Sequence, residues 1–189
     1  MITNIYVLIC TGIFIYIHFI DVGDKLTTAL RLGAFYPPQI REKKEYWRFI
    51  TCHFIHIDFL HFFMNAYALY QLGHFFEEML GPFGYLYLIV ISMVFSSLMC
   101  YSASQISWRH DQTITLGASG TVYGFFGAIV ALGLFVGGPF MTLLEDFMLV
   151  IVINVVYTIF NPQISKTGHL GGFIGGVFAI VVLLALKMI

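Results

Sequence analysis

Charged residues are placed along this chain so that six long stretches contain no Asp, Glu, Lys or Arg. The stretches are Met1–Ile20, Phe59–Phe76, Met79–Trp108, Gln112–Leu144, Phe147–Ser165 and Thr167–Leu186. Each is close to the ~20 residues that an α-helix needs to cross the hydrocarbon core of a bilayer. Only 10% of the 189 residues are charged, whereas a soluble domain carries about 25%. The pattern excludes a water-soluble fold and predicts an all-α, polytopic membrane protein with six transmembrane helices.

Turn-forming residues indicate where these helices end. Gly81-Pro82-Phe83-Gly84 separates the second helix from the third, Gly137-Gly138-Pro139 ends the fourth, and Asn161-Pro162 ends the fifth. We expect helices at residues 5–20, 57–76, 85–102, 118–136, 146–160 and 168–188. Residues 21–56 form a long connection rich in aromatic residues, which favours a structured segment at the membrane interface. With no internal repeat, the sequence predicts one domain over residues 1–189.

Several classes of function and site are not indicated by this composition. The net charge is −1 and there is no long basic run, so nothing favours nucleic-acid binding. Cys10, Cys52 and Cys100 are odd in number and widely spaced, which favours packing roles over a disulfide framework or a metal site. His53 and His56 could join a nearby histidine around a metal, but Asp58 is the one carboxylate at ligand spacing. We therefore expect neither a metal nor an organic cofactor.

Polar residues gather at three helix ends that six crossings would place on the same side of the membrane. Polar groups within membrane helices are costly, and by default they indicate function. The clusters are His53, His56, His61 and Asn65 at the second helix, Gly117-Ala118-Ser119-Gly120 with Tyr123 at the fourth, and Gly168-His169-Leu170-Gly171-Gly172 at the sixth. A transporter or channel would instead need ionisable residues near the midplane, where Asn154 is the one strongly polar candidate in the fifth helix.

Ser119 is the strongest candidate for a nucleophile. At a helix N-terminus, unpartnered backbone N–H groups and the helix dipole favour negative charge, so they suit the oxyanion formed by attack on a carbonyl. Gly117 and Gly120 remove bulk beside the serine and would let a substrate backbone approach. Serine needs a base, and His169 at the start of another helix is the natural candidate. The alternative is that Ser119 is a small interhelical contact and His169 an interfacial histidine.

Small residues favour a close approach of the two helices that carry Ser119 and His169. The stripes are Gly120-xxx-Gly124-xxx-Ala128 and Gly168-xxx-Gly172-xxx-Gly176. If these helices pack on each other, Ser119 and His169 lie at matching depths within hydrogen-bond reach. His61 and Asn65, four residues apart on one helix face, could both donate to an oxyanion, or could instead form an interhelical hydrogen-bonded pair.

Together these clusters resemble the rhomboid family of intramembrane serine proteases. The matching residues are Trp47-Arg48, His61-xxx-Asn65, Gly117-Ala118-Ser119-Gly120 with Tyr123, and His169-xx-Gly172-xxx-Gly176. The four motifs occur in the family's order and extend from Trp47 to Gly176. The resemblance implies a bare six-helix rhomboid-like bundle and a Ser–His dyad with no acidic third member.

The resemblance also implies a role for each matching residue. Ser119 would be the nucleophile and His169 the general base and then acid. The Ser119 amide, His61 and Asn65 would form the oxyanion hole. Tyr123 would orient His169, and Trp47-Arg48 would anchor the first loop in the outer leaflet. A mobile fifth helix at Phe147–Phe160, with the loop Asn161–Thr167, would admit the substrate sideways.

The implied substrates are transmembrane helices of other proteins within the lipid bilayer, cleaved near a membrane end. The alternative is a catalytically silent, Derlin-like protein that binds membrane helices. Of the nine Lys and Arg residues, all but Lys187 fall on the face of the first loop; the positive-inside rule would make that face cytoplasmic. The family instead has a cytoplasmic N-terminus and a site that opens outward. We follow the family and expect a multi-pass protein of the cell membrane; its oligomeric state is not predicted.

Overall fold

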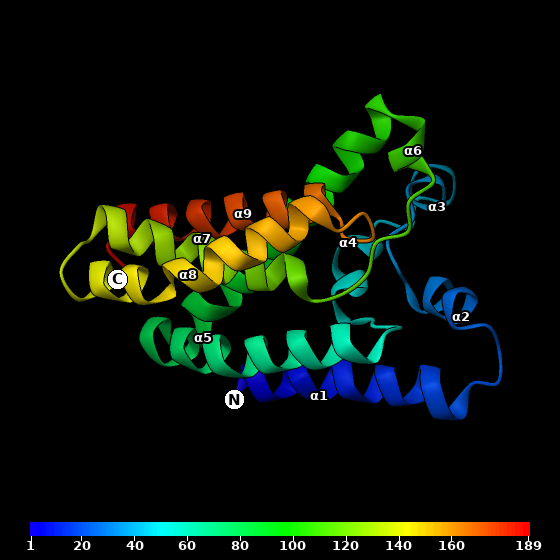
Figure 1. Cartoon of the computed structure of the whole chain (residues 1–189), viewed down its shortest axis with the longest axis horizontal. Coiled ribbons are helices and arrows are strands. Elements are labelled where there is room, and N and C mark those ends of the chain that lie inside the picture. The colour runs from blue at the N-terminus through cyan, green and yellow to red at the C-terminus, as the bar shows by residue number, and fades with distance from the viewer.

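The structure is a computed structural model that describes all residues 1–189, and it consists of helices joined by short loops (Figure 1). The elements in chain order are α1 Ile2–Ile15, the π-helix η1 Tyr16–Ile20, α2 Lys25–Leu32, α3 Pro37–Lys43, α4 Arg48–Thr51, the 3₁₀-helix η2 Cys52–Phe54, α5 Phe59–Ile106, α6 Trp108–Asp111, α7 Ser119–Phe135, α8 Pro139–Phe160 and α9 Lys166–Ala185. One isolated β-bridge pairs Phe35 with Thr115. The predicted all-α fold is confirmed.

Four helical segments are long and apolar enough to cross a membrane: Ile2–Ile20, α5, α8 and α9. The apolar helix α7 is somewhat shorter, at 17 residues. Helix α5 spans 48 residues because it contains two helices that meet at Gly81, whose backbone (φ 67°, ψ 172°) is not helical. Glycine tolerates this conformation, and Pro82 is suited to begin the next helix. The break expected over residues 81–84 is therefore confined to a single residue.

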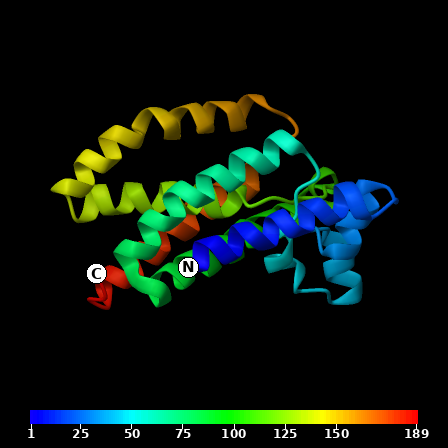
Figure 2. The same cartoon turned by 90° about the horizontal axis from the view of Figure 1, so that it is seen from below.

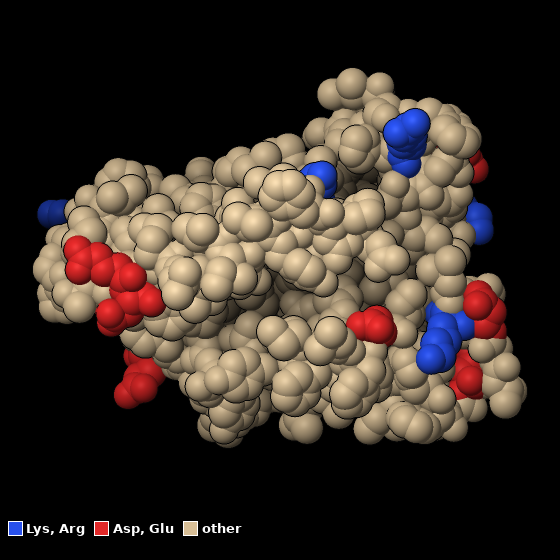
Figure 3. All heavy atoms as spheres, viewed as in Figure 1, with Lys and Arg blue, Asp and Glu red and all other residues tan.

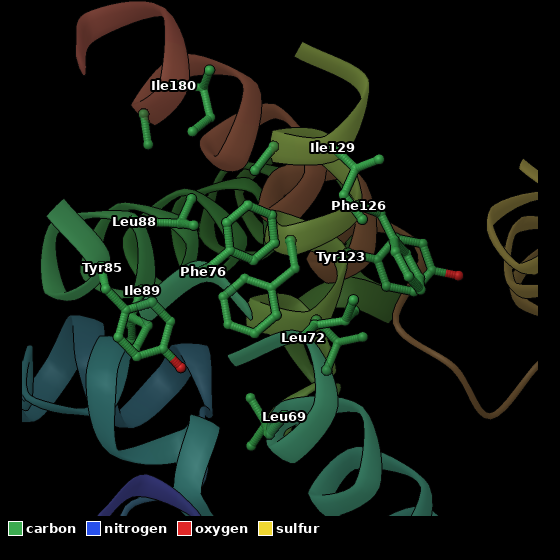
Figure 4. Packing of buried hydrophobic residues seen from close by; sticks show 14 of the residues in the cluster. Leu69, Leu72, Phe76, Tyr85, Leu88, Ile89, Tyr123, Phe126, Ile129 and Ile180 are labelled. Atoms are coloured by element: carbon green, nitrogen blue, oxygen red, sulfur yellow. The ribbon is translucent and has the colours of Figure 1, made fainter. Parts of the chain in front are cut away.

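Helices α7 and α9 form the centre of the bundle, and glycines bring their backbones together. A Cβ atom added to Gly172 would overlap the carbonyl oxygen of Gly120, and one added to Gly176 would overlap that of Gly124. The two small-residue stripes thus face each other, as the sequence predicted. Figure 4 shows the neighbouring apolar packing, in which Leu72, Phe76, Tyr85 and Leu88 of α5 lie beside α7. The site-bearing ends of α7 and α9 are therefore held close together.

The segment between α1 and α5 is folded rather than extended. Arg48 is 3% exposed, and its guanidinium donates to the carbonyl oxygens of Leu30 (2.8 Å) and Ala34 (2.7 Å) and to Glu45. Trp47, in contrast, is 46% exposed. Arg48 thus holds the segment together from within, while the neighbouring indole is available to its surroundings. In Figure 3 most of the visible Lys and Arg residues lie over the end of the molecule that contains α2, α3 and α4.

Helix α8 is the least enclosed of the long helices. Only Leu144, Ile151 and Thr158 are buried among its 22 residues. Figure 2 shows it running along the outside of the bundle, apart from the first half of α5. Figure 3 shows a hollow in the surface between these two elements. The helix expected to admit substrate is therefore held to the bundle by few side chains.

Candidate active site

Ser119 and His169 meet at the adjoining ends of α7 and α9. Ser119 is the first residue of α7, and His169 lies in the first turn of α9. The distance between His169 Nε2 and Ser119 Oγ is 2.8 Å, within hydrogen-bond range although the residues are 50 positions apart. The expected proximity is therefore present, because the opposed glycines set the depth of both helix starts. The arrangement can pass a proton from the serine hydroxyl to the imidazole.

The chain enters α7 through a tightly held turn. Gly117 has φ 113°, and a Cβ atom there would lie 2.7 Å from His61 Nε2. The Gly117 N–H donates to the Cys52 carbonyl (2.9 Å), and the Ala118 N–H donates to His56 Nε2 (3.1 Å). The next backbone N–H, that of Ser119, lies in the first helical turn, where helix geometry offers it no partner. It is therefore available to an oxyanion.

The glycines of this motif serve contacts within the protein. His61 lies against Gly117, and a Cβ atom on Gly120 would overlap the Ser96 side chain and lie 2.9 Å from His53 Cε1. We expected Gly117 and Gly120 to leave room for a substrate backbone. The structure instead shows that both positions are small because neighbouring side chains approach them closely.

His61 and Asn65 lie on one face at the start of α5, as their spacing predicts. The backbone N–H of His61 donates to the Asp58 carboxylate (2.7 Å), which caps the helix. Asn65 Nδ2 donates to the backbone carbonyl of His61 (2.8 Å), so the interhelical pairing considered above does not describe it. An amide nitrogen carries two protons, and this bond uses one of them. The His61 ring lies beside Gly117, near the turn that leads to Ser119.

His53 and His56 support the site by hydrogen bonds that the sequence did not predict. His53 Nε2 lies 3.1 Å from both the Met93 carbonyl oxygen and Ser97 Oγ. His56 accepts the Ala118 N–H as described. The Nε2 atoms of the two histidines thus bond to different parts of the protein. The sequence marked both histidines as functional, but only the folded chain shows that His56 holds the backbone before Ser119 and that His53 bonds to α5.

The remaining side of His169 contacts α7 and α8. The Tyr123 ring stacks on the imidazole, with centroids 4.0 Å apart. Thr158 Oγ1 lies 2.8 Å from His169 Nδ1 and 2.5 Å from the Tyr123 hydroxyl. Tyr123 lies beside His169, as predicted from the sequence, whereas Thr158 was not among the predicted site residues. The one available signal was that Thr158 and Asn154 are polar residues four apart in the largely apolar second half of α8.

Comparison with known proteins agrees with this architecture. A family model described as the Rhomboid domain matches residues 43–186. The RHOMBOID-like protein 5 of Arabidopsis thaliana is 32% identical over 167 residues, which cover 86% of this chain and 52% of that protein. The Rhomboid protease GluP of Bacillus subtilis is 29% identical over 136 residues, covering 71% of this chain and 25% of that protein. The Rhomboid-like protease 1 of Toxoplasma gondii is 26% identical over 153 residues, which cover 78% of this chain and 50% of that protein.

This chain therefore belongs to the rhomboid family, which confirms the family that its motifs resemble. It is an integral membrane protein in contact with the lipid bilayer. It spans about half the length of two of these three relatives and a quarter of the third.

Proposed function

We propose that this protein is an intramembrane serine endopeptidase that cleaves transmembrane helices of other membrane proteins. The observation that carries the proposal is the 2.8 Å distance between Ser119 Oγ and His169 Nε2. In the proposed reaction the Ser119 hydroxyl donates its proton to His169 Nε2 while Oγ attacks the scissile carbonyl carbon. His169 then gives that proton to the leaving amine, and an acyl-enzyme ester remains. Water attacks the ester in the second half, with His169 again the base.

The developing oxyanion would lie among three donors. The Ser119 backbone N–H has no helical partner, Asn65 keeps one amide proton free of the bond to its own helix, and the His61 ring lies beside Gly117. Donors fixed before the reaction stabilise transition-state charge without reorganising. The support for this assignment is that the His61 ring lies against Gly117, two residues before Ser119, and that Asn65 lies one turn beyond His61 on the same helix face.

Substrate would enter from the side of the bundle. The proposed gate is Phe147–Phe160 of α8 with the loop Asn161–Thr167, because α8 is loosely held and borders the hollow seen in Figure 3. A bound helix would have to unwind locally, since an amide inside an intact helix is sequestered by its hydrogen bonds. A small residue before the scissile bond and a weakly helical cleavage segment suit this site.

We further propose that the protein lies in the cell membrane with the site open to the extracytoplasmic side. In that orientation the exposed Trp47 would sit in the outer leaflet, where indole rings prefer the interface. The buried Arg48 would keep the loop folded from within.

The test is cleavage of a model single-pass substrate by the purified protein in liposomes. The parent is compared with Ser119→Ala and His169→Ala, and thermal unfolding confirms that each variant is folded. The proposal requires cleavage by the parent and its loss in both variants. Binding of the helix without cleavage by the parent would instead identify the catalytically silent, Derlin-like alternative. Cleavage that persists in Ser119→Ala would overturn the serine mechanism.

A further inference from the structure

A continuous hydrogen-bonded chain runs from Ser119 through His169 to the outer helix α8. Behind the imidazole, Thr158 Oγ1 is 2.8 Å from His169 Nδ1 and 2.5 Å from the Tyr123 hydroxyl oxygen. The Tyr123 hydroxyl also lies 2.7 Å from the backbone carbonyl oxygen of Asn154. Thr158, Tyr123 and His169 are all buried. These side chains therefore have few partners other than one another.

The last acceptor in this series of hydrogen bonds, the Asn154 carbonyl oxygen, determines the direction of every bond in the series. A backbone carbonyl oxygen can only accept, so the single hydroxyl proton of Tyr123 points to Asn154. The Tyr123 oxygen must then accept from Thr158, which uses the one proton of the threonine hydroxyl. Thr158 Oγ1 has only lone pairs left for the imidazole, so His169 Nδ1 must carry a proton and donate it.

This direction selects one form of the catalytic histidine. A neutral imidazole carries its proton on either Nδ1 or Nε2, and the hydrogen bond at one nitrogen decides which. With the proton on Nδ1, the lone pair of Nε2 faces the Ser119 hydroxyl at 2.8 Å. In the other form both Nε2 and Oγ would carry protons, and His169 could not accept the serine proton.

We propose that Thr158 is a positioning residue that holds His169 in the Nδ1-protonated form, with Tyr123 as the relay that orients the threonine hydroxyl. This inference rests on the proposed serine protease function. Thr158 and Asn154 both belong to α8, in which Leu144 and Ile151 are the buried residues besides Thr158. Displacement of α8 from the bundle separates Thr158 from His169, so the base is correctly protonated only when α8 lies in the position seen here.

The variants that test this inference differ by single polar groups. Thr158→Val removes the hydroxyl and keeps the branched shape, and Thr158→Ser restores the hydroxyl. In Tyr123→Phe the threonine hydroxyl is free to donate to Nδ1, which favours the wrong form of the imidazole. Thr142→Val is the matched control, because Thr142 is an exposed threonine of the same helix whose side chain makes no hydrogen bond.

We expect Thr158→Val to lower kcat by about tenfold, because the loss of one hydrogen bond can reduce the population of Nδ1-protonated His169 by about that factor. KM should change less than about twofold. Thr158→Ser and Thr142→Val keep the parent kcat. Tyr123→Phe lowers kcat to a similar extent as Thr158→Val, and the double variant is no worse than either single variant. Non-additivity of this kind is expected for groups that act as one unit.

Nitrogen-15 NMR of labelled histidine provides a second readout, assigned by comparison with His169→Ala. The parent should show a protonated Nδ1 and a bare Nε2, and Thr158→Val should show a mixture. An unchanged kcat and spectrum in Thr158→Val would overturn the inference, and so would a Thr158→Ser variant as impaired as Thr158→Val. If the parent cleaves nothing yet shows the expected spectrum, the proposed function fails while the hydrogen-bonded chain stands.

Discussion

The close contact of α7 and α9 makes Gly172→Ala the most informative single change in the bundle. A Cβ atom at this position would overlap the carbonyl oxygen, carbonyl carbon and Cα of Gly120, all of them backbone atoms that cannot rotate away. The Cβ atom would lie 2.0 Å from the Gly120 oxygen, so the helices must separate by at least about 1 Å to relieve the overlap, and overpacking of this kind costs about 1–3 kcal/mol of unfolding free energy. Gly172 is one helical turn from His169, so the separation acts directly on the Ser119–His169 pair.

The same displacement predicts the loss of activity. Lengthening the 2.8 Å contact between His169 Nε2 and Ser119 Oγ by about 1 Å breaks it, and a misplacement of this size can cost about 100-fold in rate. We expect kcat for a model transmembrane substrate to fall by about that factor, with a lower thermal unfolding midpoint in detergent. Gly12→Ala is the control, because a Cβ atom at Gly12 meets nothing within 4 Å. Parent-like kcat and midpoint in Gly172→Ala would refute the packing argument.

Three further predictions concern the surroundings of the site. His56→Phe leaves the Ala118 N–H without its acceptor, so stability should fall by about 1–3 kcal/mol together with kcat; parent-like thermal unfolding would contradict the role given to His56. Arg48→Met removes the guanidinium that donates to the Leu30 and Ala34 carbonyls and to Glu45, and the loss of unfolding free energy should reach about 3 kcal/mol; an unfolding midpoint that does not move would show that the first loop does not depend on Arg48. The hydrogen bond and charge of Arg41 lower the pKa of Asp111 in the folded protein, so the stabilisation is present above the ordinary carboxyl pKa of about 4 and is lost as the pH falls through the lower folded value. Acid titration of the unfolding midpoint should therefore be less steep in Asp111→Asn, and identical acid slopes would exclude the contribution.

The proximity of Ser119 and His169 could be predicted from the sequence because it depends on local patterns. The glycine spacing on α7 and α9 specifies how closely the two helices approach, and it places Ser119 and His169 at matching depths. The uncharged stretches likewise indicate the apolar helices, because a helix that crosses a bilayer cannot tolerate frequent charge. These features depend on residue type and spacing alone.

The partner of His169 Nδ1 could not be predicted in this way. Thr158 precedes His169 by 11 residues, with the end of α8 and a loop between them. Whether its hydroxyl reaches the imidazole depends on the angle and rotation of α8, which no local pattern determines. The same limit applies to His56, because its bond to the Ala118 N–H joins segments 62 residues apart. Long-range polar contacts of this kind follow from the packing of the whole bundle.

Covalent trapping tests, without knowledge of the substrate, whether His169 activates Ser119 as a nucleophile. The parent protein in lipid vesicles is treated with a fluorophosphonate, which reacts with activated serine hydroxyls, and the modified residue is located by mass spectrometry. We expect one adduct, on the Ser119 hydroxyl, which is lost in both Ser119→Ala and His169→Ala while the variants remain folded. A folded parent that gains no adduct at Ser119, or one whose labelling is unchanged in His169→Ala, would contradict this expectation.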